Sequence, residues 1–210
     1  MNKRAIICAA LAVCAIVSVC QAQIVTNGSF EEGFNGWTVS GAVDVETWTV
    51  TCSDGTNSAR FNAAEASASG VVAQTFATVP GDRYLLQFDF GNWSPSGSSQ
   101  QRLSVEVTGS GELLSKVVAA SSDAAHMMSW VPNSFYFWTD STNTTLTFRD
   151  VSYQTTSTDG HLDNVRVEYA GPALSIRVSH MEVCWPSKTN QLYQLQYRST
   201  LTDTWPASVP

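Results

Sequence analysis

Acidic side chains are the most numerous groups in this sequence that can take part in chemistry. Asp44 and Glu46 are two residues apart, and Glu31, Asp89 and Glu106 are further acids in the same region. Paired carboxylates are the groups that glycosidases use as general acid and as base or nucleophile. A strand that alternates between two faces also places carboxylates on its solvated side. These acids therefore fit either a glycosidase or lyase, or an ordinary strand surface.

Other catalytic and metal-binding motifs are scarce. The sequence has no Gly-x-Ser-x-Gly, His-Glu-x-x-His or Cys-x-x-Cys motif and no glycine-rich phosphate-binding loop. Its three histidines, His126, His161 and His180, stand in unrelated contexts. A Ser–His–Asp site stays open, because triad partners need not be neighbours in sequence. The missing motifs favour a protein that is not an enzyme.

Tryptophan is frequent, with 7 residues in the chain. Trp37 follows Gly36 at the start of an expected strand and is predicted to lie in the core. Trp48 is in phase with Asp44 and Glu46, which predicts an exposed ring on a polar strand face.

A second aromatic pair, Tyr136 and Trp138, alternates with Phe135 and Phe137. If the phenylalanines point inward, the pair points outward. Exposed rings beside carboxylates and amides suit carbohydrate, because a ring packs on the C–H face of a sugar while polar groups bond its hydroxyls. The alternative is that these rings are half-buried residues at the rim of the fold. The candidate ligand-binding residues are Trp48, Trp93, Tyr136 and Trp138.

The elements that must position these residues are predicted to be strands. Apolar residues make up 43% and charged residues 14% of the chain, a balance that argues against disorder. Alternating apolar runs, such as 84–90 and 103–107, are separated by polar turns. Without long helical segments to cover a parallel sheet, two antiparallel sheets packed face to face are the expected arrangement. We predict an all-β antiparallel β-sandwich.

The first residues predict export. Lys3 and Arg4 precede the small and apolar run 5–19, and small residues follow at the expected cleavage site. We predict a signal peptide over residues 1–22, and a secreted or cell-surface protein that is not inserted into the membrane after cleavage. The run is shorter than the ~20 residues of a spanning helix. A membrane anchor and a lipoprotein are the alternatives.

Removal of this segment changes the charge and the cysteine count. It leaves 9 of the 11 basic residues against 18 acidic ones, a net charge of −9. So acidic a chain is a poor partner for nucleic acid, and we predict a polysaccharide or cell-surface glycan as its partner. Cys52 and Cys184 are too few for a disulfide scaffold. Two separate thiols and one long-range bridge both stay open.

The composition changes at Gly171 and Pro172, after which three further short strands are expected. Three strands cannot bury much core alone. We predict a sandwich over residues 23–170 and a partial C-terminal β-module over 171–210, which either docks on the sandwich or continues in a module that the chain truncates.

Several motifs resemble the jelly-roll carbohydrate-binding modules of the galactose-binding-like superfamily and, within it, the domain of unknown function numbered 642. The resemblance spans residues 24–169 and implies a galactose-binding-domain-like jelly roll with a glycan ligand. Plant members carry extra cysteines that this chain lacks, so their disulfides are not carried over. The segments that carry it are 27–33, 36–37, 70–76, 80–81, 84–88, 146–148 and 160–167.

The resemblance also implies a structural calcium ion (Ca²⁺) held by Glu31 and Asp163. Asp163 is expected in phase with Val165 and Val167 on the core face, where a carboxylate is costly unless a cation or several donors meet it. Arg60 is an alternative partner. Calcium takes six to eight oxygens, so backbone carbonyls of nearby turns would complete the site.

Three functions are consistent with the sequence. The preferred one is an exported, non-catalytic carbohydrate-binding or cell-surface interaction domain. The alternatives are a structural or adhesive surface protein without a sugar ligand, and a glycosidase or lyase that acts on polysaccharide.

Overall fold

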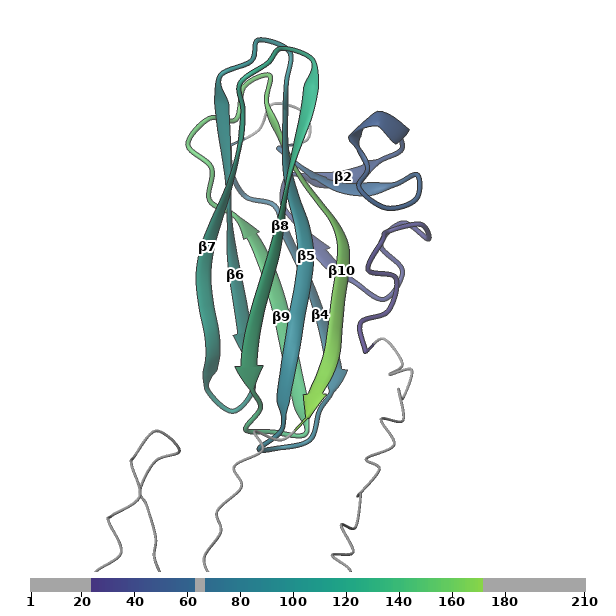
Figure 1. Ribbon diagram of the computed structural model, residues 1–210, viewed down its shortest axis with the longest axis vertical. Coiled ribbons are helices and arrows are strands. Elements are labelled where there is room, and N and C mark those ends of the chain that lie inside the picture. The colour runs from purple at the N-terminus through teal and green to yellow at the C-terminus, as the bar shows by residue number, and fades with distance from the viewer. Residues whose placement is uncertain (1–23, 63–66, 172–210) are drawn as a thin grey trace, which may run out of the picture. The chain divides into compact units, whose positions relative to one another are not determined.

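The computed structural model describes residues 24–62 and 67–171, and within these ranges ten strands form two five-stranded antiparallel sheets (Figure 1). The β1 sheet has the order β1-β4-β9-β6-β7, and the β2 sheet has the order β2-β3-β10-β5-β8. One short 3-10 helix, η1 (Thr49–Thr51), follows β2. The strands are β1 (Thr38–Ser40), β2 (Val43–Glu46), β3 (Ser58–Phe61), β4 (Val71–Ala77), β5 (Arg83–Ser94), β6 (Ser99–Thr108), β7 (Glu112–Ser122), β8 (Met127–Trp138), β9 (Asn143–Asp150) and β10 (Asp159–Gly171).

The core lies between the sheets and consists of the predicted alternating residues. On β5, every second residue from Tyr84 to Phe90 is buried, and β6 and β9 bury their alternating apolar residues in the same way. The rings of Phe88 and Phe148 meet across the core at 5.1 Å between centroids. Period-two alternation thus confirms the predicted sandwich, because only inward residues can be removed from water.

The N-terminal segment is folded by one asparagine. The Asn27 side chain donates to the carbonyl of Gly33 and accepts from the N–H of Glu32. The indole of Trp37 donates to the Asn27 carbonyl at 3.0 Å, and Trp37 is only 8% exposed, so its predicted core position is confirmed. The segment then joins β10, where the Val165 N–H donates to the Gly28 carbonyl.

Strand β10 contains a β-bulge that reverses its alternation. The register shifts between Asp163 and Arg166, and Asn164 has a positive φ of 54°, a conformation that asparagine tolerates better than most residues. Leu162, before the bulge, and Val165, after it, both lie in the core. Asp163 therefore lies on the outer face, and the prediction that it shares the face of Val165 and Val167 is wrong.

Several predictions fall outside the described residues. These are the signal peptide at 1–22 and the C-terminal β-module at 171–210, of which only Gly171 is described, together with His180 and Cys184. Within 24–62 and 67–171, no helix is long and apolar enough to cross a membrane.

Candidate functional site

A pocket of about 140 Å³ opens on the outer face of the β2 sheet. Its floor comes from neighbouring strands in register, because His161 of β10 pairs with Arg60 of β3, and Asp159 of β10 pairs with Trp93 of β5. The connection from β2 to β3 adds Trp48. We call this site the tryptophan pocket, and its lining residues are Glu46, Trp48, Thr51, Arg60, Trp93, Asp159 and His161.

Two of the predicted ligand-binding residues meet here. The rings of Trp48 and Trp93 lie edge to face with centroids 6.2 Å apart. Trp48 is 51% exposed, as predicted, although it lies beyond the end of β2 at Glu46 rather than within a strand. The Trp93 indole nitrogen is buried and has no hydrogen-bond partner within the described part of the chain. The pair forms an aromatic wall with one ring open to solvent.

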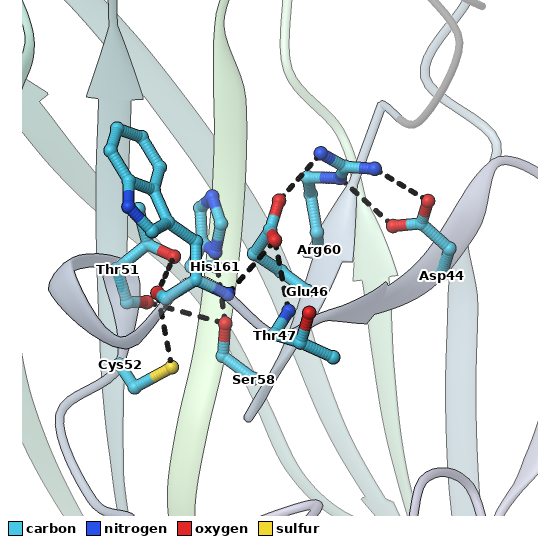
Figure 2. Close-up of polar contacts among 9 residues, drawn as sticks. Asp44, Glu46, Thr47, Thr51, Cys52, Ser58, Arg60 and His161 are labelled. Carbon is cyan, nitrogen blue, oxygen red and sulfur yellow. Dashed lines mark hydrogen bonds and ion pairs between the residues drawn. The ribbon is translucent and has the colours of Figure 1, made fainter. Parts of the chain in front are cut away.

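Glu46 and Arg60 fix the loop that carries Trp48 (Figure 2). One Glu46 oxygen accepts from the N–H groups of Thr47 and Trp48 at 2.8 and 3.0 Å, and the other accepts from Arg60 at 2.7 Å. The Arg60 guanidinium also bonds both oxygens of Asp44, at 2.9 and 2.6 Å. Arg60 therefore pairs with Asp44 and Glu46, and not with Asp163 as considered from the sequence.

A buried histidine supports the loop from below. The Ser58 hydroxyl lies 3.0 Å from Nδ1 of His161 and 3.3 Å from the Thr51 carbonyl oxygen. The Thr51 hydroxyl and N–H in turn donate to the Trp48 carbonyl at 2.7 and 2.8 Å. Burial lowers the pKa of His161 to about 3, and the charge of Arg60 acts in the same direction. The imidazole is therefore neutral at physiological pH.

Neutral burial of His161 predicts a pH-dependent stability. The folded pKa is about 3, while an unfolded histidine titrates near 6.5, so the unfolded state binds an extra proton between these values. The stabilisation is complete above pH 6.5 and is lost as the pH falls, by about 1.4 kcal/mol per pH unit. Urea unfolding of wild type and His161→Gln at several pH values measures the difference. Parallel stability curves would contradict the prediction.

Gly91 makes room for an aromatic ring beside the pocket. It lies opposite Trp130 of β8 and His161 of β10. A Cβ atom at this position would come within 2.7 Å of the Trp130 ring and would also clash with Met128. The Trp130 ring faces His161 with centroids 6.4 Å apart. The absent side chain thus lets Trp130 lie across β5.

Replacement of Gly91 by alanine is expected to destabilise the fold by about 1–3 kcal/mol, because the new methyl group overpacks the site. Gly111→Ala is the matched control, since no atom lies closer than 3.8 Å to its added Cβ. Denaturant midpoints measure both variants. Equal midpoints would show that Trp130 moves aside without a measurable cost.

The two predicted calcium ligands hold one loop. Asp163 accepts from the N–H groups of Ser53 and Asp54 at 2.8 and 2.9 Å. Glu31 accepts from the N–H groups of Thr56 and its neighbour at 2.7 and 2.8 Å. Across residues 24–62 and 67–171, no group of three or more His, Cys, Asp or Glu side chains is arranged to hold a metal ion. Several donors therefore meet the buried carboxylate, and the calcium ion stays a prediction.

The other two predicted ligand-binding residues lie elsewhere on the same sheet face. Tyr136 and Trp138 of β8 are each 52% exposed, while Phe137 between them is buried. Their outward orientation is confirmed, but they do not line the tryptophan pocket. A larger cavity of about 290 Å³ lies at the loops around Ser96 and Tyr153. Its lining residues include no tryptophan and no charged group, so the tryptophan pocket is the better candidate.

Arg60, Asp159 and His161 line the pocket but were not predicted as ligand-binding residues. Their signal in the sequence is weak, because a residue on an outer strand face reads as ordinary solvated surface. The alternation of Asp159 and His161 places them on one face. Only the register with β3 and β5 shows which partners they meet.

The fold and the pocket together define a class of protein. Two antiparallel sheets with a tryptophan-walled pocket on one outer face form a jelly-roll β-sandwich of the kind found in carbohydrate-binding modules. Residues 21–168 match the family described as "Protein of unknown function (DUF642)". The chain belongs to this family, as the resemblance implied.

Solved structures support the fold. The module TmCBM61 in complex with beta-1,4-galactotriose is 17% identical, with a TM-score of 0.53 over 70% of this chain and 99% of that one. A family 16 carbohydrate-binding module is 15% identical, with a TM-score of 0.48 over 69% and 98%. A xylan-binding domain of family 22 is 17% identical, with a TM-score of 0.48 over 73% and 99%. None of the curated proteins matches the chain significantly in sequence.

Proposed function

We propose that the chain is an exported, non-catalytic module that binds neutral glycans in the tryptophan pocket. The observation that carries the proposal is the pairing of Trp48 and Trp93 at 6.2 Å beside the polar groups of Arg60 and Glu46. The similarity to modules described with a galactotriose ligand and as xylan-binding supports a glycan as the ligand class. The predicted signal peptide supports export.

The pocket offers the two kinds of contact that a sugar needs. The exposed Trp48 ring packs against the C–H face of a pyranose. The Arg60 guanidinium uses three of its N–H groups on Asp44 and Glu46, and a guanidinium has five, which leaves donors for sugar hydroxyls. The carboxylates of Glu46 and Asp159 accept from hydroxyl groups. A pocket smaller than the roughly 300 Å³ of typical ligand clefts suits one ring at the surface of a longer glycan.

Charge favours a neutral ligand. Asp44, Glu46 and Asp159 carry three negative charges around the single positive charge of Arg60. A uronic acid would bring a further carboxylate into this field and would be repelled. Neutral hexose or pentose chains meet no such repulsion.

The arrangement favours binding over glycoside hydrolysis. The carboxylates considered as a catalytic pair, Asp44 and Glu46, are both tied to Arg60. Glu46 also holds the backbone of the Trp48 loop. These carboxylates are thus engaged in positioning the loop, and the glycosidase reading has no observation of its own in its favour.

Affinity electrophoresis and isothermal titration test the proposal with galactan, xylan and polygalacturonate. We expect binding to a neutral polysaccharide with a Kd of about 1 μM to 1 mM, or roughly −8 to −4 kcal/mol, and no binding to polygalacturonate. Absence of binding to both neutral polysaccharides would favour a structural or adhesive protein. Release of reducing sugar from either would favour an enzyme.

A further inference from the structure

Tyr136 and Trp138 form a second aromatic surface on the sheet face that holds the tryptophan pocket. Both lie on the outward side of β8 and are each 52% exposed. In the register of β5 and β8, they lie opposite Leu85 and Arg83. We call Tyr136 and Trp138 the distal pair.

The distal pair is held by a cation. The Arg83 guanidinium lies 4.8 Å from the centroid of the Tyr136 ring and donates to the carbonyl of Ala170 at the end of β10. A cation over one ring face stabilises that ring orientation. The other face of Tyr136 stays available to a ligand, so the ring is pre-oriented before binding.

A continuous strip of outer face joins the distal pair to the tryptophan pocket. Trp93 of the pocket lies opposite Met128, and Tyr136 lies opposite Leu85, so eight residues along β5 separate the two sites. At about 3.3 Å per residue, this is roughly 26 Å. The outward residues between them mix polar, small and aromatic side chains: Gln87, Asp89 and Gly91 on β5, and Trp130, Pro132 and Ser134 on β8.

We propose that one extended, neutral polysaccharide chain lies along β5 and β8, with one segment in the tryptophan pocket and a later segment on the distal pair. This inference rests on the proposed function and adds that the ligand is a linear polymer. A polymer that spans roughly 26 Å gains contacts at both ends, whereas a short oligosaccharide occupies the pocket alone. The second contact acts at a high effective concentration once the first has formed.

Isothermal titration with the trioses and hexaoses of β-1,4-galactan and β-1,4-xylan tests the inference. For the wild-type chain, we expect at least one hexaose to bind about tenfold more tightly than its triose. The double variant Tyr136→Ala with Trp138→Ala is expected to lose this advantage and to keep the triose affinity. Tyr153→Ala is the control, because Tyr153 is 83% exposed but belongs to the loop after β9.

Each outcome separates the two proposals. A double variant that binds the hexaose like wild type overturns the extended track and leaves the pocket proposal intact. Equal losses on triose and hexaose, or a clear fall in melting temperature, show that the distal pair supports the fold rather than the ligand, and also overturn the track. A wild-type chain that binds none of these sugars overturns both proposals.

Discussion

Replacement of both Trp48 and Trp93 by alanine is expected to lower the affinity for neutral polysaccharide about a hundredfold. A favourable aromatic contact contributes about 0.5–1.5 kcal/mol beyond the area that it buries, and a factor of ten in Kd corresponds to 1.4 kcal/mol. The two rings meet at 6.2 Å, so loss of both removes the aromatic wall of the pocket. Isothermal titration with the best neutral polysaccharide measures the effect.

The control variants distinguish loss of contact from loss of fold. Trp48→Phe keeps a ring and is expected to retain most of the affinity. Trp48→Ala alone is expected to change stability by no more than about 0.5 kcal/mol, because the side chain is 51% exposed. Wild-type affinity in the double variant, or an equal loss in Tyr153→Ala, would place the ligand elsewhere on the molecule.

The replacement of Phe148 by alanine is expected to destabilise the sandwich by about 3–5 kcal/mol, the usual range for a buried phenylalanine. Phe148 is completely buried. Its ring contacts Phe88 of the opposite sheet at 5.1 Å and Trp37 at 6.4 Å between centroids. The variant therefore opens a cavity where both sheets and the N-terminal segment meet. Urea denaturation, compared at equal m-values, measures the loss.

Val117→Ala is the matched control for this core substitution. Val117 belongs to β7 of the same sheet as Phe148 but is 54% exposed, so its truncation is expected to change stability by less than about 0.5 kcal/mol. Similar losses for the two variants would mean that the core does not lie between the sheets as described.

The fold could be predicted from the sequence because alternation depends on neighbouring residues only. The period-two runs identified the buried faces of β5, β6 and β9. The same reasoning oriented Tyr136 and Trp138, because the burial of Phe137 forces its neighbours outward. A strand face is a local property, and the sequence carries it directly.

The face of Asp163 could not be predicted in the same way. A single extra residue at the bulge reverses the alternation, and the run from Leu162 to Val167 reads as an uninterrupted strand. Asn164 was the available signal, since asparagine is enriched at positive φ. The resulting position of Asp163 lets it accept N–H groups of the 53–57 loop, so a buried carboxylate does not by itself require a metal.

The composition of the pocket depended on contacts distant in sequence. Trp48 and Trp93 were both predicted to bind ligand, but 45 positions separate them, and only the return of the β2–β3 connection over the sheet brings them together. That return is fixed by Glu46, which bonds two backbone N–H groups of the loop. Such a hydrogen bond has no periodic signature, so Arg60 and His161 could not be recognised as neighbours of Trp48.

The indole N–H signals of the 7 tryptophans provide the most direct test of the proposed site. The chain is labelled with ¹⁵N and titrated with the neutral oligosaccharide that binds best, and each indole signal is assigned by single Trp→Phe variants. The signals of Trp48 and Trp93 are expected to shift in a saturable manner. That of Trp37, whose indole donates to the Asn27 carbonyl near the core, is expected to stay in place. Saturable binding without a shift at Trp48 or Trp93 would contradict a glycan site in the tryptophan pocket.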